Sequence, residues 1–149
     1  MKVYKFGGAS VKDASGVRNL KEIVACAGDD LMVVISAMGK TTNALERVVA
    51  ALAQKDEATA DNEWLAVLDY HVHLAMELGL KPNEDIRFPM MPEYDHTCSY
   101  DQNYDQIVSQ GEILSTQIVA VYLLKSGIRT EWWNMPKLLR KDNTFREAQ

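Results

Sequence analysis

The chain has little cysteine, and its two cysteines form no motif. Cys26 and Cys98 lie far apart in the 149 residues, and no Cys-x-x-Cys pair is present. A small fold held together by several disulfides is therefore excluded. One disulfide between the two residues stays open at this point. We expect instead two reduced, mostly buried thiols in a cytoplasmic protein.

Long apolar runs and an excess of positive charge are also lacking. No apolar run reaches the roughly 20 residues that span a membrane, and Met1–Lys5 contains no apolar signal region. The formal net charge of -5 is unfavourable for binding nucleic acid or an anionic membrane surface. We therefore expect neither nucleic acid nor a membrane as a partner.

The composition is that of one globular α/β domain. Hydrophobic residues make up 47% of the chain and charged residues 25%. Short apolar runs at residues 2–6 and 31–35 predict two buried strands, and the apolar spacing between Ser10 and Ala27 predicts a helix. Ser10 or Ser15 could cap this helix. A strand, a helix and a second strand predict a parallel sheet.

The rest of the chain is predicted to be mostly helical. Gly111 interrupts the apolar pattern of the last predicted helix, and such a glycine often allows close approach of a neighbouring backbone or a ligand. His71 is predicted to pack in the core, because His71 and His73 point to different helix faces and so do not form a zinc pair. The predicted elements are helices 44–54, 58–78 and 104–126, an irregular segment or short helical hairpin at 81–103, a third strand at 128–133 and a turn at 134–136.

The first candidate site is the segment Lys5–Ser10, at the end of the first predicted strand. Gly7 and Gly8 allow a tight turn whose bare N–H groups can approach an anion. The following helix start and Lys5 add positive charge. The segment therefore suits phosphate, although an ordinary strand-to-helix turn with a solvated lysine would have the same sequence.

The second candidate site is the segment Ser36–Asn43, which leaves the second strand in the same way. In a parallel sheet both loops lie at the carboxyl edge of the strands, where ligands bind. Gly39-Lys40-Thr41 does not form a P-loop, because Val34 occupies the position of that motif's first glycine. The segment could hold a small polar or anionic ligand, or it could simply cap the next helix through Thr41, Thr42 or Asn43.

The third candidate is Glu112, next to Gly111 in the last predicted helix. Three motifs occur along the chain in this order: Lys5–Val11, Ser36–Asn43 and Ser109–Glu112. Together they make the chain resemble the N-terminal part of aspartate kinases, members of the amino acid kinase superfamily. The resemblance implies a three-layer α/β/α sandwich with a mainly parallel sheet, the carbamate kinase-like fold. It also implies ATP-dependent phosphorylation of L-aspartate to 4-phospho-L-aspartate, the first step of lysine, threonine and methionine biosynthesis.

The resemblance assigns roles to individual residues. Lys5 would neutralise charge on the phosphates during transfer, and Glu112 would hold the α-ammonium group of aspartate. Phosphate binding is implied for Lys5, Gly7, Gly8 and Ser10, and substrate binding for Ser36, Thr42, Asn43 and Glu112. Magnesium would arrive with ATP, since no cluster of metal ligands is evident in the sequence.

The chain departs from the family at several points. Ala9 replaces a threonine, a mild change, and Asn134, Pro136 and Lys141 replace the usual Asp, Arg and Thr after the third strand. The family's catalytic domain is also about twice as long. We therefore expect residues 1–149 to be the N-terminal substrate-binding part, inactive alone and able to form a homodimer. The alternative function is a non-catalytic relative that binds an amino acid or an anion.

Overall fold

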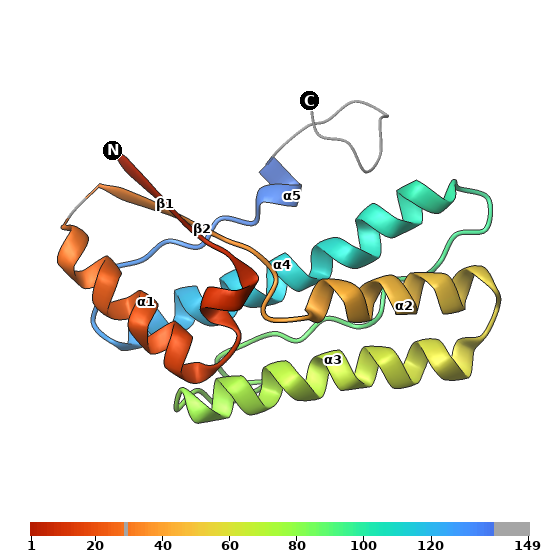
Figure 1. Ribbon diagram of the computed structural model, residues 1–149, viewed down its shortest axis with the longest axis horizontal. Helices are drawn as coiled ribbons and strands as arrows, with labels where there is room; N and C mark the ends of the chain where they lie inside the picture. Colours follow the sequence, from red (N-terminus) through yellow and green to blue (C-terminus); the bar gives the residue numbers. More distant parts are fainter. Residues whose placement is uncertain (29, 139–149) are drawn as a thin grey trace.

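A two-stranded parallel sheet and one crossover helix form the N-terminal part of the fold. A computed structural model of the chain describes residues 1–28 and 30–138 (Figure 1). Strands β1 (Lys2–Phe6) and β2 (Leu31–Ile35) pair in parallel, with Lys5 opposite Val34, and helix α1 (Ala14–Ala27) connects them. The predicted strand–helix–strand unit is confirmed.

The start of α1 differs from the prediction. A short 3₁₀ turn, η1 (Gly8–Val11), comes first, and Ser10 N–H donates to the Gly7 carbonyl within it (2.9 Å). The helix begins only after this turn, so Asp13 caps it by accepting from Gly16 N–H at 2.8 Å. The expectation that Ser10 or Ser15 caps the helix is therefore wrong.

Three long helices follow the sheet and its crossover helix. They are α2 (Thr41–Ala53), α3 (Glu57–Glu77) and α4 (Tyr100–Lys125), and α2 lies beside both of the others (Figure 1). Helix α2 begins three residues before the predicted start, and α4 begins four residues before it. Ser99 caps α4 by accepting from Gln102 N–H at 3.2 Å, which explains its earlier start.

The buried side chains form two clusters. The first lies between the sheet, α1 and the C-terminal halves of α3 and α4. The second, which we call the helical body, lies between α2, the N-terminal half of α3 and the first turns of α4, and its buried members are Leu45, Val48, Val49, Ala51, Leu52, Ala60, Trp64, Val67, Ile107, Val108 and Leu114. Leu65 (55% exposed) and Leu124 (57% exposed) belong to neither cluster.

The two faces of the sheet have different surroundings. Phe6, Leu31 and Val33 pack against the first cluster, so the described helices cover this face. Val3 and Val34 on the opposite face are 58% and 43% exposed. A three-layer sandwich needs a helical layer here as well, which the described residues do not supply. That part of the predicted fold stays a prediction.

Two connecting segments complete the described chain. The stretch between α3 and α4 is irregular, as predicted, with one isolated bridge between Pro82 and Ile86. The predicted third strand at 128–133 is wrong, because this segment joins no ladder and Trp132 Nε1 instead donates to Thr116 Oγ1 on α4 at 3.0 Å. A short helix, α5 (Met135–Leu138), replaces the expected turn. Lys141 lies outside the described residues.

The cysteines are free, but neither of them is buried, although burial was expected. Cys26 is exposed and Cys98 is partly exposed. Cys26 lies on the outer face of α1, and the expectation of burial failed because the apolar stripe of that helix runs through Val17, Leu20 and Val24 instead.

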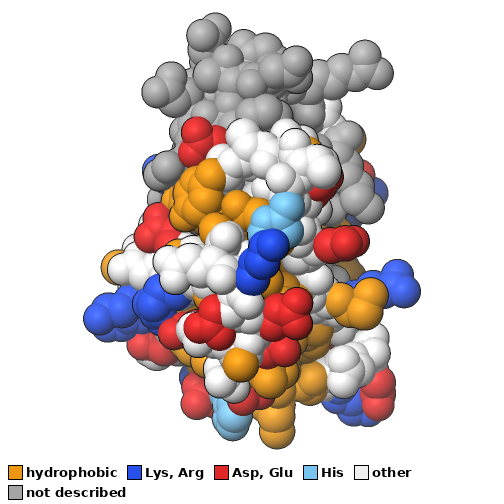
Figure 2. Space-filling view, turned by 90° about the vertical axis from the view of Figure 1, so that its right-hand side faces the viewer, with side chains coloured by type: hydrophobic (Ala, Val, Ile, Leu, Met, Phe, Trp, Pro, Cys, Tyr) orange, Lys and Arg blue, Asp and Glu red, His pale blue; other side chains and the backbone are white. Residues whose placement is uncertain are grey.

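One helix, α4, is long and apolar enough to cross a membrane when judged on length and composition alone. Its most apolar window has a mean hydropathy of 1.4, and 44% of that window is buried inside the protein. The helix contributes to both buried clusters. On the face that Figure 2 shows, acidic and basic side chains are interspersed among hydrophobic ones wherever described residues are visible.

Candidate active site

The loops that follow β1 and β2 touch each other through their backbones. Ser36 N–H donates to the Phe6 carbonyl, and Gly39 N–H donates to the Gly8 carbonyl, both at 3.0 Å. A Cβ atom added to Gly8 would collide with the carbonyl oxygen of Ala37. Only glycine therefore fits where the two loops cross, and the expected meeting of the loops at the carboxyl edge of the sheet is confirmed.

Helix α4 closes the second loop from another side. A Cβ atom added to Gly111 would lie 3.0 Å from Ala37 Cβ and 3.1 Å from Thr41 Cγ2. Ser115 Oγ donates to the Ser36 carbonyl at 2.9 Å. Gly111 thus allows close helix packing, one of the interpretations that its position in the sequence suggested. We call residues 7–12, 36–41 and 111–115 together the loop junction.

Glu112 lies on the exposed surface of the loop junction. Packing around the carboxylate removes part of its water and raises its pKa, while its own N–H and the Ala37 N–H favour the ionised form and oppose the shift. The carboxylate therefore faces the second loop. A partly desolvated carboxylate at this position is suited to an ammonium group, which would restore the lost stabilisation of its charge.

Three exposed lysines lie in or beside the two loops. Lys5 is exposed at the end of β1 and has no ion pair within the described part of the chain. Lys12 and Lys40 are also exposed and without ion pairs there, and Lys12 Cβ lies 3.7 Å from the Cβ position of Gly39. Sequence reasoning singled out Lys5 alone. It overlooked a pattern in the sequence: each of the two glycine loops has a lysine within it or next to it.

The first turn of α2 carries three polar side chains. Lys40 occupies the N-cap position without a side-chain hydrogen bond, so capping by Thr41, Thr42 or Asn43 does not occur. Thr41 is 4% exposed, and its Oγ1 has no hydrogen-bond partner among the described residues. The free N–H groups and the dipole of this helix start favour an anion.

The predicted site residues are brought together only in part. Gly8, Ser36 and Glu112 are linked through Ala37, Gly39 and Ser115. Thr42 and Asn43 lie in the first turn of α2 instead of the preceding loop. Gly7 borders open space, and Ser10 is exposed with its N–H used in η1. No described hydrogen bond or ion pair connects the Lys5 ammonium to the other site residues.

Metal ligands are not clustered in the part of the chain that the structure describes. Residues 1–28 and 30–138 contain no group of three or more His, Cys, Asp or Glu side chains that could hold a metal ion.

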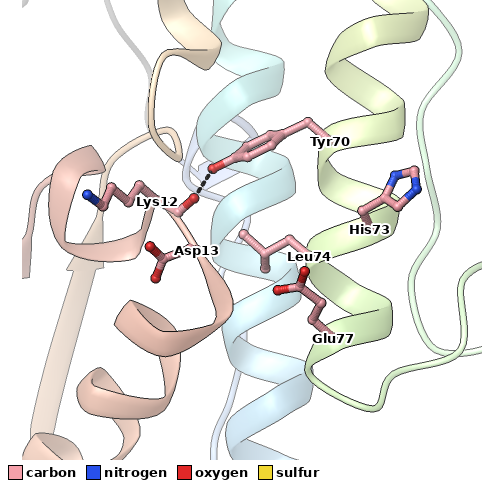
Figure 3. Close-up of a pocket in the computed structure, with 6 residues that line it drawn as sticks. All are labelled: Lys12, Asp13, Tyr70, His73, Leu74 and Glu77. Atoms are coloured by element: carbon pink, nitrogen blue, oxygen red, sulfur yellow. Dashed lines mark hydrogen bonds between the residues drawn. The ribbon is translucent and has the colours of Figure 1, made fainter.

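A separate cavity of about 330 Å³ lies beside the loop junction, between the start of α1 and α3 (Figure 3). Its lining residues are Lys12, Asp13, Tyr70, His73, Leu74 and Glu77. None of them was predicted as a site residue. The cavity borders the end of the first loop through Lys12 and Asp13.

Comparison with known proteins finds relatives along nearly the whole chain. The model of the amino acid kinase family matches residues 1–147. Aspartokinase 1, chloroplastic, of Arabidopsis thaliana is 28% identical over 89% of this chain and 25% of its own length. Lysine-sensitive aspartokinase 3 of Escherichia coli is 27% identical over 99% of this chain and 34% of its own length.

A solved structure is similar in fold. The structure of E. coli aspartokinase III in complex with aspartate and ADP superposes with a TM-score of 0.76 at 21% sequence identity, covering 97% of this chain and 33% of that one. The chain spans about a quarter of the length of the Arabidopsis relative and about a third of the E. coli one. With the family match extending over nearly every residue, the chain belongs to the amino acid kinase family.

Proposed function

We propose that this chain is the substrate-binding part of an aspartate kinase, which transfers the γ-phosphoryl group of ATP to the side-chain carboxylate of L-aspartate. The observation that carries the proposal is the loop junction, where two glycine loops and the Gly111–Glu112 turn of α4 meet. The similarity to a structure that holds aspartate and ADP supports the same ligands here.

The phosphoryl end of the site is assigned to the first loop and Lys5. Phosphoryl transfer depends mostly on positioning and on cancelling negative charge. Lys5 supplies a full positive charge, and Gly7 borders open space in which a phosphate can approach the backbone. Gly8 allows the crossing of the loops, and Ser10 offers its exposed side chain.

The aspartate end of the site is assigned to the second loop, α2 and α4. Glu112 would accept from the α-ammonium group, and this contact would favour its ionised form against the desolvation that raises its pKa. Thr42 would contact the substrate from the first turn of α2, with Ser36 and Asn43 beside it. The N–H groups of that turn would attract the substrate's carboxylate.

The remaining properties follow from the same proposal. Residues 1–149 form the substrate-binding part of a three-layer α/β/α domain, and ATP arrives with Mg²⁺. The function belongs to lysine, threonine and methionine biosynthesis. Free cysteines, one of them exposed, suit a reducing compartment, and we place the protein in the cytoplasm. A homodimer without nucleic acid or membrane partners remains our expectation.

Binding of L-aspartate and of inorganic phosphate by this chain, measured by titration calorimetry, tests the assignment. Lys5→Met should weaken phosphate binding about tenfold, and Glu112→Gln should weaken aspartate binding by a similar factor, because each removes a charge-assisted contact. Lys2→Met, at the other end of β1, and Glu57→Gln, at the start of α3, serve as matched controls that should change neither affinity.

Each result decides between the alternatives. If the unsubstituted chain binds neither ligand, or if both site variants bind as well as their controls, the proposed function is wrong. Binding without aspartate-dependent release of ADP is the result we expect for the chain alone. A polypeptide extended beyond residue 149 that still lacked turnover would favour the non-catalytic amino-acid-binding or anion-binding relative.

A further inference from the structure

One side chain connects α3 to both loops of the junction. The Tyr70 hydroxyl donates a hydrogen bond to the backbone carbonyl of Lys12, which lies 58 residues away in the sequence. Figure 3 shows the side chain reaching from α3 across to the end of the first loop. Because the acceptor is a backbone oxygen, this bond restrains the backbone at Lys12 and does not depend on the Lys12 side chain.

The same hydroxyl also lies against the second loop. A Cβ atom added to Gly39 would be 3.0 Å from Tyr70 Oη and 3.7 Å from Tyr70 Cζ. Gly39 has a φ angle of +56°, and its N–H makes the 3.0 Å bond to the Gly8 carbonyl that joins the loops. Tyr70 therefore bonds to the end of the first loop at Lys12 and lies beside Gly39 of the second loop.

Few hydrogen bonds join α3 to the loops from this side, although Val11 and Met38 of the loops share a buried apolar cluster with Leu74 of α3. Beside Tyr70, the start of α1 and α3 are separated by the cavity of about 330 Å³ (Figure 3). The other described side-chain bond between these helices joins Arg18 to the Glu77 carbonyl, at the far end of α3. The Tyr70 hydroxyl is thus the described hydrogen bond that ties α3 to the loop junction.

The hydroxyl is chemically suited to this role. Burial raises its pKa, and the negative charge of Asp13 raises it further. It therefore stays protonated, and able to donate, throughout the neutral pH range.

We propose that Tyr70 is a positioning residue, whose hydroxyl holds the two glycine loops in the geometry that binds phosphate and substrate. The proposal rests on the proposed function for its ligands. The restraint on the loops itself is a property of the free chain. Loss of the hydroxyl should let the first loop move away from α3 and weaken the bond between Gly39 and Gly8.

The first experiment measures the restraint without a ligand. In Tyr70→Phe, hydrogen exchange of the Gly39 amide should be about fivefold faster than in the parent, the effect of losing one net hydrogen bond. Tyr104→Phe is the matched control. Its hydroxyl donates to Glu46 Oε1 at 2.6 Å, also 58 residues away, but this bond joins α4 to α2 in the helical body. The control variant should leave Gly39 exchange unchanged.

The second experiment asks whether the restraint serves binding. Calorimetry with inorganic phosphate and with L-aspartate should show three- to tenfold weaker phosphate binding in Tyr70→Phe. The two tyrosine variants should have similar thermal stability. An affinity loss specific to Tyr70→Phe is a result that a purely structural role would not give.

The outcomes separate this proposal from the proposed function. Unchanged Gly39 exchange in Tyr70→Phe would overturn the role of Tyr70 whether or not the chain binds a ligand. Faster exchange with unchanged affinity would overturn the positioning role and leave a structural one. If the unsubstituted chain binds neither probe, the proposed function fails and the positioning role fails with it.

Discussion

The loop junction and the helical body are built in different ways. In the helical body, apolar side chains from three helices fill the space between them, as Leu45, Trp64 and Ile107 do. At the loop junction, backbone lies directly on backbone. The neighbouring backbone leaves no room for a side chain at Gly8, and Gly111 allows α4 to contact Ala37 and Thr41.

The difference decides what each region tolerates. Packed side chains can change rotamer, so a helical core absorbs many conservative substitutions at modest cost. Two backbones in contact have no such freedom. The loop junction also contains a buried hydroxyl without a described partner, that of Thr41, and a partly desolvated carboxylate, that of Glu112. Groups that reduce stability in the free chain are typical of sites prepared for a ligand.

The largest expected effect comes from adding one methyl group at the loop crossing. Gly8→Ala should lower the free energy of unfolding by about 2–4 kcal/mol, because the new Cβ meets the Ala37 carbonyl and one loop must move. Gly7→Ala is the matched control, since nothing lies within 4 Å of its Cβ position and its φ angle of -75° suits any residue. Urea unfolding of the two variants measures the difference.

If Gly8→Ala and Gly7→Ala were equally stable, the difference drawn between the loop junction and the helical body would be wrong. This result would mean that the loops can separate at no cost and that their contact does not shape the site. A large loss in both variants would point instead to the backbone conformation of the whole turn. The expected result is a loss confined to position 8.

The apolar periodicity of the sequence predicted the parts of the molecule that packed side chains hold together. The parallel pair β1 and β2 and the helix between them follow from apolar runs and spacing. The burial of His71 was predicted correctly, because it continues an apolar helix face. Glycine positions predicted the rest in outline: two loops at one edge of the sheet, and a close approach at Gly111.

Side-chain hydrogen bonds between distant segments left no signal in the sequence. Tyr70 looked like one more residue of a helix, and only the fold brings its hydroxyl to Lys12. The segment at 128–133 has the composition of a strand, yet Trp132 bonds to α4 and no ladder forms. Local preference cannot show whether a neighbouring strand is available to pair.

A smaller effect should appear in the helical part of the chain when the pH falls. His71 is fully buried, and burial lowers its pKa, against a weaker opposing effect of its bond to the Val67 carbonyl. The unfolded chain therefore takes up a proton below about pH 6.5 that the folded chain resists. Stability should be full above that pH and should fall below it, by at most about 1.4 kcal/mol per pH unit.

His73 provides the matched control for this prediction. Both rings contact the carbonyl four residues earlier at 2.7 Å, Val67 for His71 and Asp69 for His73, but His73 is exposed. Urea midpoints between about pH 5.5 and pH 7.5 should lose this slope in His71→Leu and keep it in His73→Leu. The same slope in both variants would show that His71 is not the group responsible.

The smallest effect is expected from an ion pair on the outside of the helical body. Arg47 on α2 contacts Glu63 on α3 through two bonds, Nε–Oε1 at 2.9 Å and Nη2–Oε2 at 2.8 Å. The Arg47 side chain is 57% exposed, so water and salt screen most of the attraction. Glu63→Gln should lower Tm by about 1–2 °C at low salt, and by less near 1 M salt. Glu84→Gln, which removes the more exposed pair with Lys81, should leave Tm unchanged. A Tm loss as large as that of Gly8→Ala would mean that polar contacts between α2 and α3, and not their packed side chains, hold the helical body together.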